Sequence, residues 1–169
     1  MHLIYKDKLT VIDIDIREKV TLIGGDSASG KTYFITRIKH YITETADRLV
    51  NGISCNVDAD TLVIFEGSDL KQLQNYNNKL IIIDRFDYLM SICKEQYYIK
   101  DLMDSDSNTY IVMSRNIKNF KHLSFNSLWC LQRVEKDNKI YLRFIPEFEE
   151  GKMFTLLLVF DEEKIKNEL

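Results

Sequence analysis

The stretch TLIGGDSASGKTYFITRIK, residues 21–39, carries three of the six glycines in the chain. The run KVTLIGG at 19–25 is mostly apolar, as in a buried β-strand, and apolar residues then recur at helical spacing from Phe34 to about Leu49. The sequence therefore predicts a strand, a glycine-rich turn and a helix in direct succession.

The glycine-rich turn fits a known pattern. Residues 25–32 match G-x-x-x-x-G-K-[ST] at every fixed position. Backbone N–H groups can hold a phosphate chain only if the loop wraps closely around it, which requires positions without a Cβ and with access to positive φ. Gly25 and Gly30 fill those positions, and the N-terminus of the following helix directs its N–H groups and dipole toward the same anion. The alternative, a turn that only caps a helix, seldom matches this pattern by chance.

Each part of the loop has an expected role. The ammonium group of Lys31 would reach the β- and γ-phosphates, and the hydroxyl of Thr32 would bind Mg²⁺. The residues expected to contact the nucleotide are Gly25, Asp26, Ser27, Ala28, Ser29, Gly30, Lys31, Thr32 and Tyr33.

A second apolar strand ends in an acidic residue. LIIID at 80–84 has the pattern of a Walker B strand, in which Asp84 would complete the Mg²⁺ shell; the alternative is that Asp84 only caps the next helix. Further apolar runs are TLVIFEG at 61–67 and YIVMS at 110–114. In the segments between these runs, apolar residues recur at helical spacing. Strands of this kind are buried on both faces, so the sequence predicts an α/β protein with a mainly parallel core sheet.

The two ends of the chain have a different pattern. Residues 2–17 predict an N-terminal β-hairpin, and residues 125–160 predict a C-terminal hairpin, with a tight turn at Asp137-Asn138, followed by a strand. These antiparallel strands are expected at the margins of the sheet. Nothing marks a boundary, so residues 1–169 are expected to form one domain.

With these motifs the sequence resembles the P-loop NTPases, in the branch that has an extra strand between the Walker A and Walker B strands. That branch includes the AAA-type, RecA-like and STAND ATPases. The resemblance covers about residues 18–131 and implies a three-layer P-loop fold that binds ATP and Mg²⁺.

Two details are similar to the STAND and AAA families. Asp84 and Asp87 keep both aspartates of an Asp-Gly-x-Asp-Glu pattern, and VMSR places Ser114 or Arg115 where a γ-phosphate sensor often stands. The resemblance implies Lys31, Asp87 and Arg115 as the catalytic set. Arg85 stands where a catalytic Glu often follows the Walker B Asp, which favours slow hydrolysis or hydrolysis that depends on a partner.

The expected function is that of a Mg-ATP-binding, slow ATPase, a nucleotide-dependent switch or motor subunit that works with a protein partner or as a homo-oligomer. One alternative is a nucleoside or nucleotide kinase, although the segment after VMSR lacks the Arg-rich lid of such enzymes. Another is an assembly module that binds nucleotide without turnover. No guanine-reading Asn/Thr-Lys-x-Asp motif is present, so adenine is the expected base.

The remaining sequence features give less information about function. The net charge of −3 does not call for nucleic acid or a membrane, and the basic stretch at 114–122 is more simply a solvated loop. The N-terminus has no signal-peptide or membrane-spanning pattern, so a soluble cytoplasmic protein is expected. Tyr5 lies about where ABC-type ATPases place an adenine-stacking aromatic, but the Leu-Ser-Gly-Gly signature is missing and a core or surface aromatic is favoured. The three cysteines, Cys55, Cys93 and Cys130, lack metal or disulfide spacing and are expected to be buried free thiols.

Overall fold

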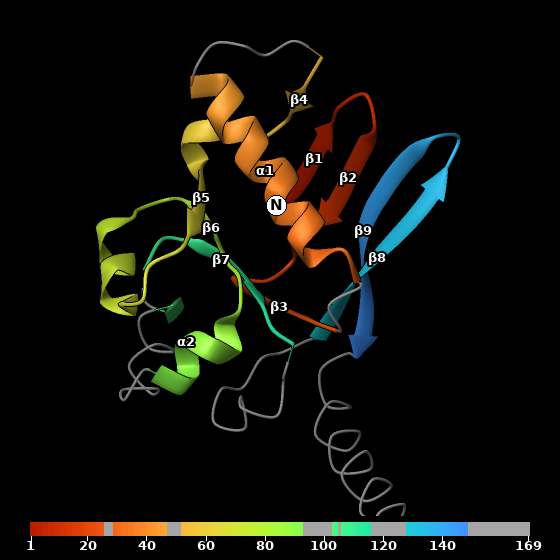
Figure 1. Cartoon of the computed structure of the whole chain (residues 1–169). Coiled ribbons are helices and arrows are strands. Elements are labelled where there is room, and N and C mark those ends of the chain that lie inside the picture. Colours follow the sequence, from red (N-terminus) through yellow and green to blue (C-terminus); the bar gives the residue numbers. More distant parts are fainter. Residues whose placement is uncertain (26–28, 47–51, 93–102, 105, 116–127, 149–169) are drawn as a thin grey trace, which may run out of the picture.

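The protein is described by a computed structural model over residues 1–25, 29–46, 52–92, 103–104, 106–115 and 128–148. Its strands form one nine-stranded sheet in the order β4-β1-β2-β9-β8-β3-β7-β6-β5. They are β1 (His2–Lys6), β2 (Thr10–Asp15), β3 (Val20–Gly24), β4 (Ser54–Cys55), β5 (Leu62–Phe65), β6 (Leu80–Ile83), β7 (Thr109–Met113), β8 (Leu128–Lys136) and β9 (Lys139–Phe148). The described part of the chain is thus mixed α/β, with a curled, mostly parallel sheet and few helices (Figure 1).

One half of the sheet is parallel throughout. β8, β3, β7, β6 and β5 pair side by side in the same direction, as the apolar runs predict. All four residues of β6 are buried, and their side chains alternate between two clusters: Leu80 and Ile82 belong to one, Ile81 and Ile83 to the other. Alternation along a strand places successive side chains on opposite faces, so both faces of this half are covered.

The other half contains the antiparallel pairs. β1 and β2 form the predicted N-terminal hairpin, and the short β4 adds to β1 at the edge. β8 and β9 form the predicted C-terminal hairpin, where Asp137 and Asn138 have φ of 52° and 59°, as a type I′ turn requires.

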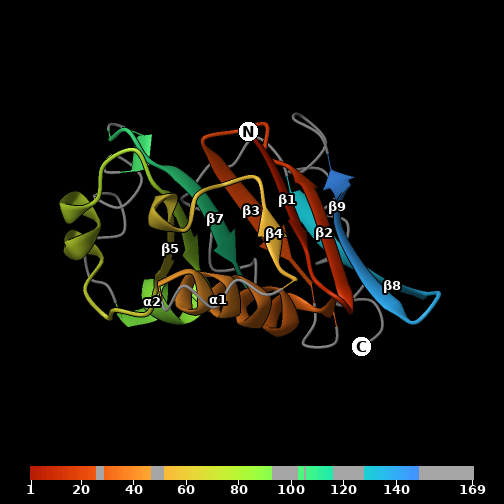
Figure 2. The same cartoon turned by 90° about the horizontal axis from the view of Figure 1, so that it is seen from above.

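The position of the C-terminal hairpin differs from the expectation. β8 pairs parallel to β3 and β9 pairs parallel to β2, so this hairpin lies inside the sheet and joins its two halves. Figure 2 shows β1, β2, β9 and β8 on one side of β3, with β7 and β5 on the other. Of the described antiparallel strands, only those of the N-terminal hairpin and β4 lie at a margin. The predicted strand at 153–160 lies outside the described residues.

The helices follow the predicted order. α1 (Lys31–Ala46) begins where the glycine-rich turn ends, and α2 (Phe86–Ile92) follows β6. The predicted continuation of the first helix to Leu49 falls outside the described residues. The short helical stretch after β5 is a 3-10 helix, η3 (Leu70–Asn75), and a second 3-10 turn, η2 (Ala59–Thr61), precedes β5.

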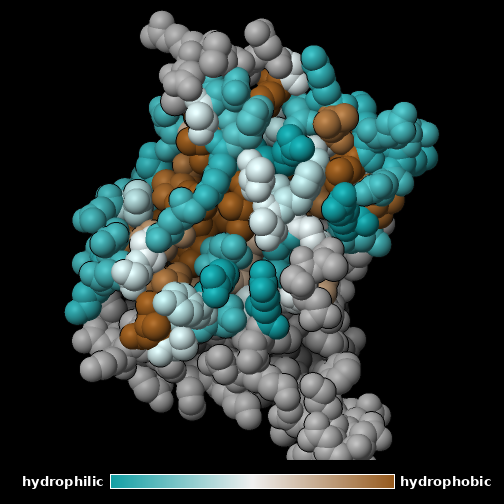
Figure 3. Space-filling model, viewed as in Figure 1, coloured by the Kyte–Doolittle hydropathy of each residue, from teal (hydrophilic) through white to brown (hydrophobic). Residues whose placement is uncertain are grey.

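The helices pack on different clusters. Phe34, Ile35, Ile38 and Tyr41 of α1 join the first cluster with residues of β1, β2 and β9, while α2 and η3 contribute to the second. On the face seen in Figure 3, hydrophobic strips show between rows of hydrophilic side chains. Among the described residues, no helix is long and apolar enough to cross a membrane.

Candidate functional site

The glycine-rich loop connects the end of β3 to the start of α1. Gly25 has φ of 106° and Gly30 has φ of 93°, both in the region that side chains rarely adopt. The backbone conformation of the loop therefore requires glycine at both positions, because residues with a Cβ rarely adopt these φ values. Asp26, Ser27 and Ala28 lie outside the described residues.

The end of the loop packs against the β8–β9 hairpin. A Cβ on Gly30 would lie 3.4 Å from Cδ2 of Leu142 and 3.5 Å from Cβ of Arg133. The backbone oxygen of Gly30 accepts from the N–H of Phe34 at 2.9 Å, which makes the first helical turn of α1. Gly30 is thus fixed between the hairpin and the helix.

Lys31 lies inside the loop. It is 5% exposed, and its ammonium group donates to the backbone oxygen of Gly25 and, at 2.9 Å, to Oγ of Ser29. A buried ammonium group requires such acceptors. Thr32, the next residue, is exposed, so the structure places the charge within the loop and the hydroxyl-bearing residue at its surface.

The other predicted residues follow neighbouring strands. β7 lies between β3 and β6, and the three strands are parallel, so their carboxyl ends share one edge of the sheet. Asp84 directly follows β6, and Ser114 directly follows β7 and donates its backbone N–H to Ile23 of β3 at 2.9 Å. The loop, Asp84 and Ser114–Arg115 therefore lie along the same edge. Ser114 is buried and Arg115 is exposed.

The segment after Asp84 has an unusual backbone. Arg85 has φ of 51°, and it stands at the Gly position of the Asp-Gly-x-Asp-Glu pattern. Its guanidinium carbon lies 5.2 Å from the centre of the Tyr88 ring. Asp87, in the first turn of α2, is half-buried, and its Oδ1 is buried with no hydrogen-bond partner among the described residues. A buried carboxylate oxygen without a hydrogen-bond donor costs free energy. Asp87 is therefore a candidate for a functional role.

A polar cluster beside the loop was missed by sequence reasoning. Two arginines lie near the Tyr33 ring: the guanidinium carbon of Arg37 is 4.7 Å from the ring centre, and that of Arg133 is 5.3 Å from it. The Tyr33 hydroxyl forms a hydrogen bond with Oγ1 of Thr10 at 2.6 Å. Tyr33 and Arg37 are one helical turn apart, but Thr10 and Arg133 come from β2 and β8. No local pattern signals that these strands meet at α1.

Asp7, in the turn between β1 and β2, continues this cluster. Its carboxylate lies 3.5 Å from Nη1 of Arg37 and accepts from the Tyr5 hydroxyl at 2.6 Å. Burial by itself would raise the pKa of Asp7, but the hydrogen bonds and the charge of Arg37 outweigh it and lower that pKa. Burial and the bond to Asp7 raise the pKa of Tyr5, which is fully buried and packs edge-to-face on Tyr41. Tyr5 is therefore a core aromatic, the interpretation that the sequence favoured.

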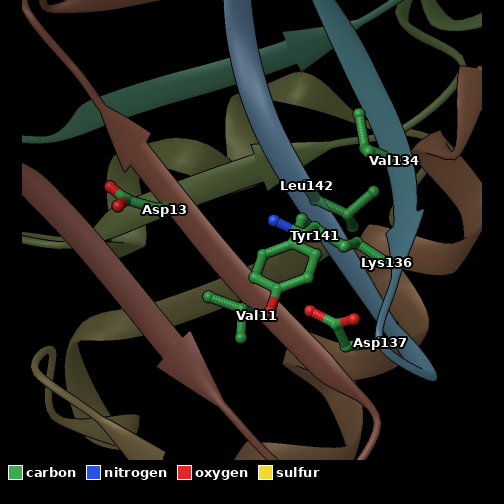
Figure 4. A pocket seen from close by; sticks show the side chains of 7 residues that line it. All are labelled: Val11, Asp13, Val134, Lys136, Asp137, Tyr141 and Leu142. Carbon is green, nitrogen blue, oxygen red and sulfur yellow. The ribbon is translucent and has the colours of Figure 1, made fainter.

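A groove of about 640 Å³ lies elsewhere, on β2, β8 and β9. Figure 4 shows the Tyr141 ring in its middle, with Asp137 and Lys136 nearby. Its lining residues are Val11, Asp13, Val134, Lys136, Asp137, Tyr141 and Leu142, none of which belongs to the glycine-rich loop. Of its lining residues, Leu142 also packs on Gly30 at the end of the loop.

Two smaller points concern metals and thiols. The described part of the chain has no group of three or more His, Cys, Asp or Glu side chains that would hold a metal ion by themselves. In the described part of the chain, Cys55 and Cys130 form no disulfide, and both are half-buried. Burial raises the pKa of the Cys55 thiol, and Cys93 lies outside the described residues.

The site is not assigned by comparison with known proteins. No family model matches the chain, and no curated protein matches it in sequence.

Proposed function

We propose that this chain is a P-loop NTPase that binds Mg-ATP at residues 25–32. The observation that carries the proposal is the loop itself: a full match to the phosphate-loop pattern, between a strand and a helix, with both glycines at positive φ and Lys31 inside. Backbone N–H groups, the helix N-terminus and one ammonium group are the means by which proteins hold a phosphate chain.

The sheet supports membership of the branch with an additional strand. β7 separates β3, which carries the loop, from β6, which carries Asp84. α1 packs on one buried cluster and α2 on the other, and the strands of the parallel half alternate between these clusters. We propose that these elements form the three-layer P-loop fold, extended by the N-terminal and C-terminal hairpins.

The residues at the sheet edge suit Mg²⁺. A hydroxyl from Thr32 and a carboxylate from Asp84 are oxygen ligands, which this ion prefers, and phosphate oxygens and water supply the remaining ligands in sites of this kind. When bound, Mg²⁺ neutralises charge on the phosphate chain. Within the described residues no larger carboxylate cluster competes for this role.

Slow turnover follows from the residues after Asp84. Arg85 is a cation and cannot accept a proton from water, and Tyr88 is exposed and lies beside Arg85. Asp87 is the acid proposed to orient the attacking water, and Arg115 is proposed to contact the γ-phosphate. With one weak candidate base, the chain acts as a nucleotide-dependent switch or motor subunit whose turnover a protein partner or a second copy accelerates.

Melting curves with and without nucleotide test the proposal. At a concentration one hundred times Kd, Mg-ATP stabilises the fold by about 2.7 kcal/mol, which raises the melting temperature of a domain of this size by roughly 5–10 °C. Lys31→Ala should lose most of this shift. An unmoved melting curve of the wild-type protein at millimolar Mg-ATP would refute the proposal.

A product assay separates the activities that share a phosphate loop. Purified protein is incubated with ATP or GTP, and both phosphate release and transfer to added nucleosides are followed. Slow release without transfer is expected for an ATPase. Transfer to a nucleoside would replace the ATPase by a kinase, and nucleotide binding without either reaction would indicate an assembly module.

A further inference from the structure

We propose that Arg133 of β8 is a second cation of the phosphate site, one that contacts the nucleotide phosphates beside Gly30, the last glycine of the loop. This inference rests on the proposed function and assigns a role to a residue outside both sequence motifs. It is carried by the place of the Arg133 side chain next to the last glycine of the loop.

The side chain runs along the end of the loop. Its Cβ and Cδ lie 3.5 Å and 3.8 Å from the point where a Cβ of Gly30 would be, and its guanidinium carbon lies 5.3 Å from the centre of the Tyr33 ring. The parallel pairing of β8 with β3 sets this position, because β8 continues past the end of β3 toward the loop. A guanidinium group is therefore held beside the backbone that is proposed to hold phosphate.

The present contacts of Arg133 are weak ones. Nη2 pairs with Oε1 of Glu135 at 2.5 Å, but the two side chains are 39% and 67% exposed, and solvent screens such a pair strongly. Arg37, the other cation at Tyr33, is 25% exposed and pairs with Asp7, which is 10% exposed. Arg133 is thus the cation that can exchange its partner for a phosphate at a small cost in free energy. Its planar guanidinium group can donate two parallel hydrogen bonds to phosphate oxygens.

Arg133 and Lys31 contact different residues of the loop. The Lys31 ammonium group bonds to Gly25 and Ser29, whereas Arg133 packs on Gly30 and approaches Tyr33. Since Lys31 is proposed to reach the β- and γ-phosphates, we assign Arg133 to the part of the phosphate chain that ADP and ATP share. Its removal should weaken the binding of both nucleotides by the same factor.

Titration calorimetry with Mg-ADP, with a non-hydrolysable ATP analogue and with adenosine tests the inference. Arg133→Gln should weaken both nucleotides by about 10- to 100-fold and leave adenosine unchanged, while Arg133→Lys should restore part of the loss. Arg17→Gln is the matched control: Arg17 also pairs with an exposed acid, Asp15, and lies 6.0 Å from the Trp129 ring, but it precedes the amino end of β3. It should leave the affinities unchanged.

The outcomes separate this inference from the proposed function. Nucleotide affinity that is unchanged in Arg133→Gln, while the wild-type protein binds and Lys31→Ala does not, would overturn the role of Arg133 and leave the phosphate loop standing. A lower melting temperature of Arg133→Gln without a change in affinity would assign Arg133 to the fold alone. Failure of the wild-type protein to bind either nucleotide would overturn both proposals.

Discussion

Asp7 links the turn between β1 and β2 to α1 through its contact with Arg37. We therefore expect Asp7→Asn to destabilise the protein. Its carboxylate accepts from the Tyr5 hydroxyl at 2.6 Å and from the backbone N–H groups of Leu9 and Thr10 at 2.7 Å and 2.6 Å, and it lies 3.5 Å from Arg37. The side chain is 10% exposed. Neutralising it leaves Arg37 without its anion and weakens the bonds of the buried Tyr5 hydroxyl.

Hydrogen bonds to a charged group contribute about 1.5–3 kcal/mol each, and the amide of Asn keeps some of them, so the expected loss is about 2–4 kcal/mol. For a chain of this length, the melting temperature should fall by roughly 4–16 °C at pH 7, measured by circular dichroism. Asp13→Asn is the control, because Asp13 is 63% exposed and its ion pair among the described residues is with the exposed His2. Its effect should stay within about 0.5 kcal/mol. Equal melting temperatures for the two variants would show that the Asp7 carboxylate does not stabilise the fold.

The pH dependence has a definite sign. The pKa of Asp7 is lowered in the folded protein from its ordinary value of 3.8, so the charged form stabilises the fold above that pH. This stabilisation is lost as the pH falls through the lowered pKa. The difference in unfolding free energy between wild type and Asp7→Asn should therefore be constant from pH 7 to about pH 5 and shrink below about pH 4. A difference that does not shrink as the pH falls below about 4 would contradict the assigned charge.

The remaining predictions concern the loop and the sheet edge. Gly30→Ala forces a side chain to φ of 93° and against Leu142, and should lower stability by about 1–3 kcal/mol, measured by urea unfolding, and weaken nucleotide binding. Asp84→Asn should reduce the Mg²⁺ dependence of nucleotide binding in a titration while metal-free affinity remains; an unchanged dependence would remove Asp84 from the site. Asp87→Asn should lower kcat in a phosphate-release assay with little change in affinity, and undiminished turnover would mean that another group orients the water. Arg115→Ala should weaken ATP more than ADP in calorimetry, and equal losses would indicate a structural arginine.

The features that sequence reasoning predicts correctly are those with local signals. The apolar run before Gly25, the helix after Gly30 and the all-apolar β6 have patterns that strand and helix geometry imposes within a few residues. The Asp137-Asn138 turn belongs to this group, because both residue types tolerate positive φ and the flanking runs have strand character.

The features that it misses depend on contacts between distant residues. The parallel pairing of β2 with β9 brings Thr10 beside Ile140, and nothing in either strand specifies that partner. The two-residue β4 is too short to leave a pattern. Arg133 stands 100 positions after Tyr33, in a strand whose own sequence has no phosphate-binding pattern, so only the assembled sheet places its charge beside the loop.

The proposed function requires that Lys31 and its loop bind a phosphate chain. Calorimetric titration of the purified wild-type chain and of Lys31→Ala with ATP, each with and without Mg²⁺, measures this at equilibrium. We expect saturable binding at one site per chain for the wild type, tighter with Mg²⁺, and an affinity at least about tenfold weaker for a folded Lys31→Ala protein, since a charge-assisted contact is lost. Equal affinity of the two proteins for ATP, or no saturable binding by the wild type at millimolar ATP, would contradict the account.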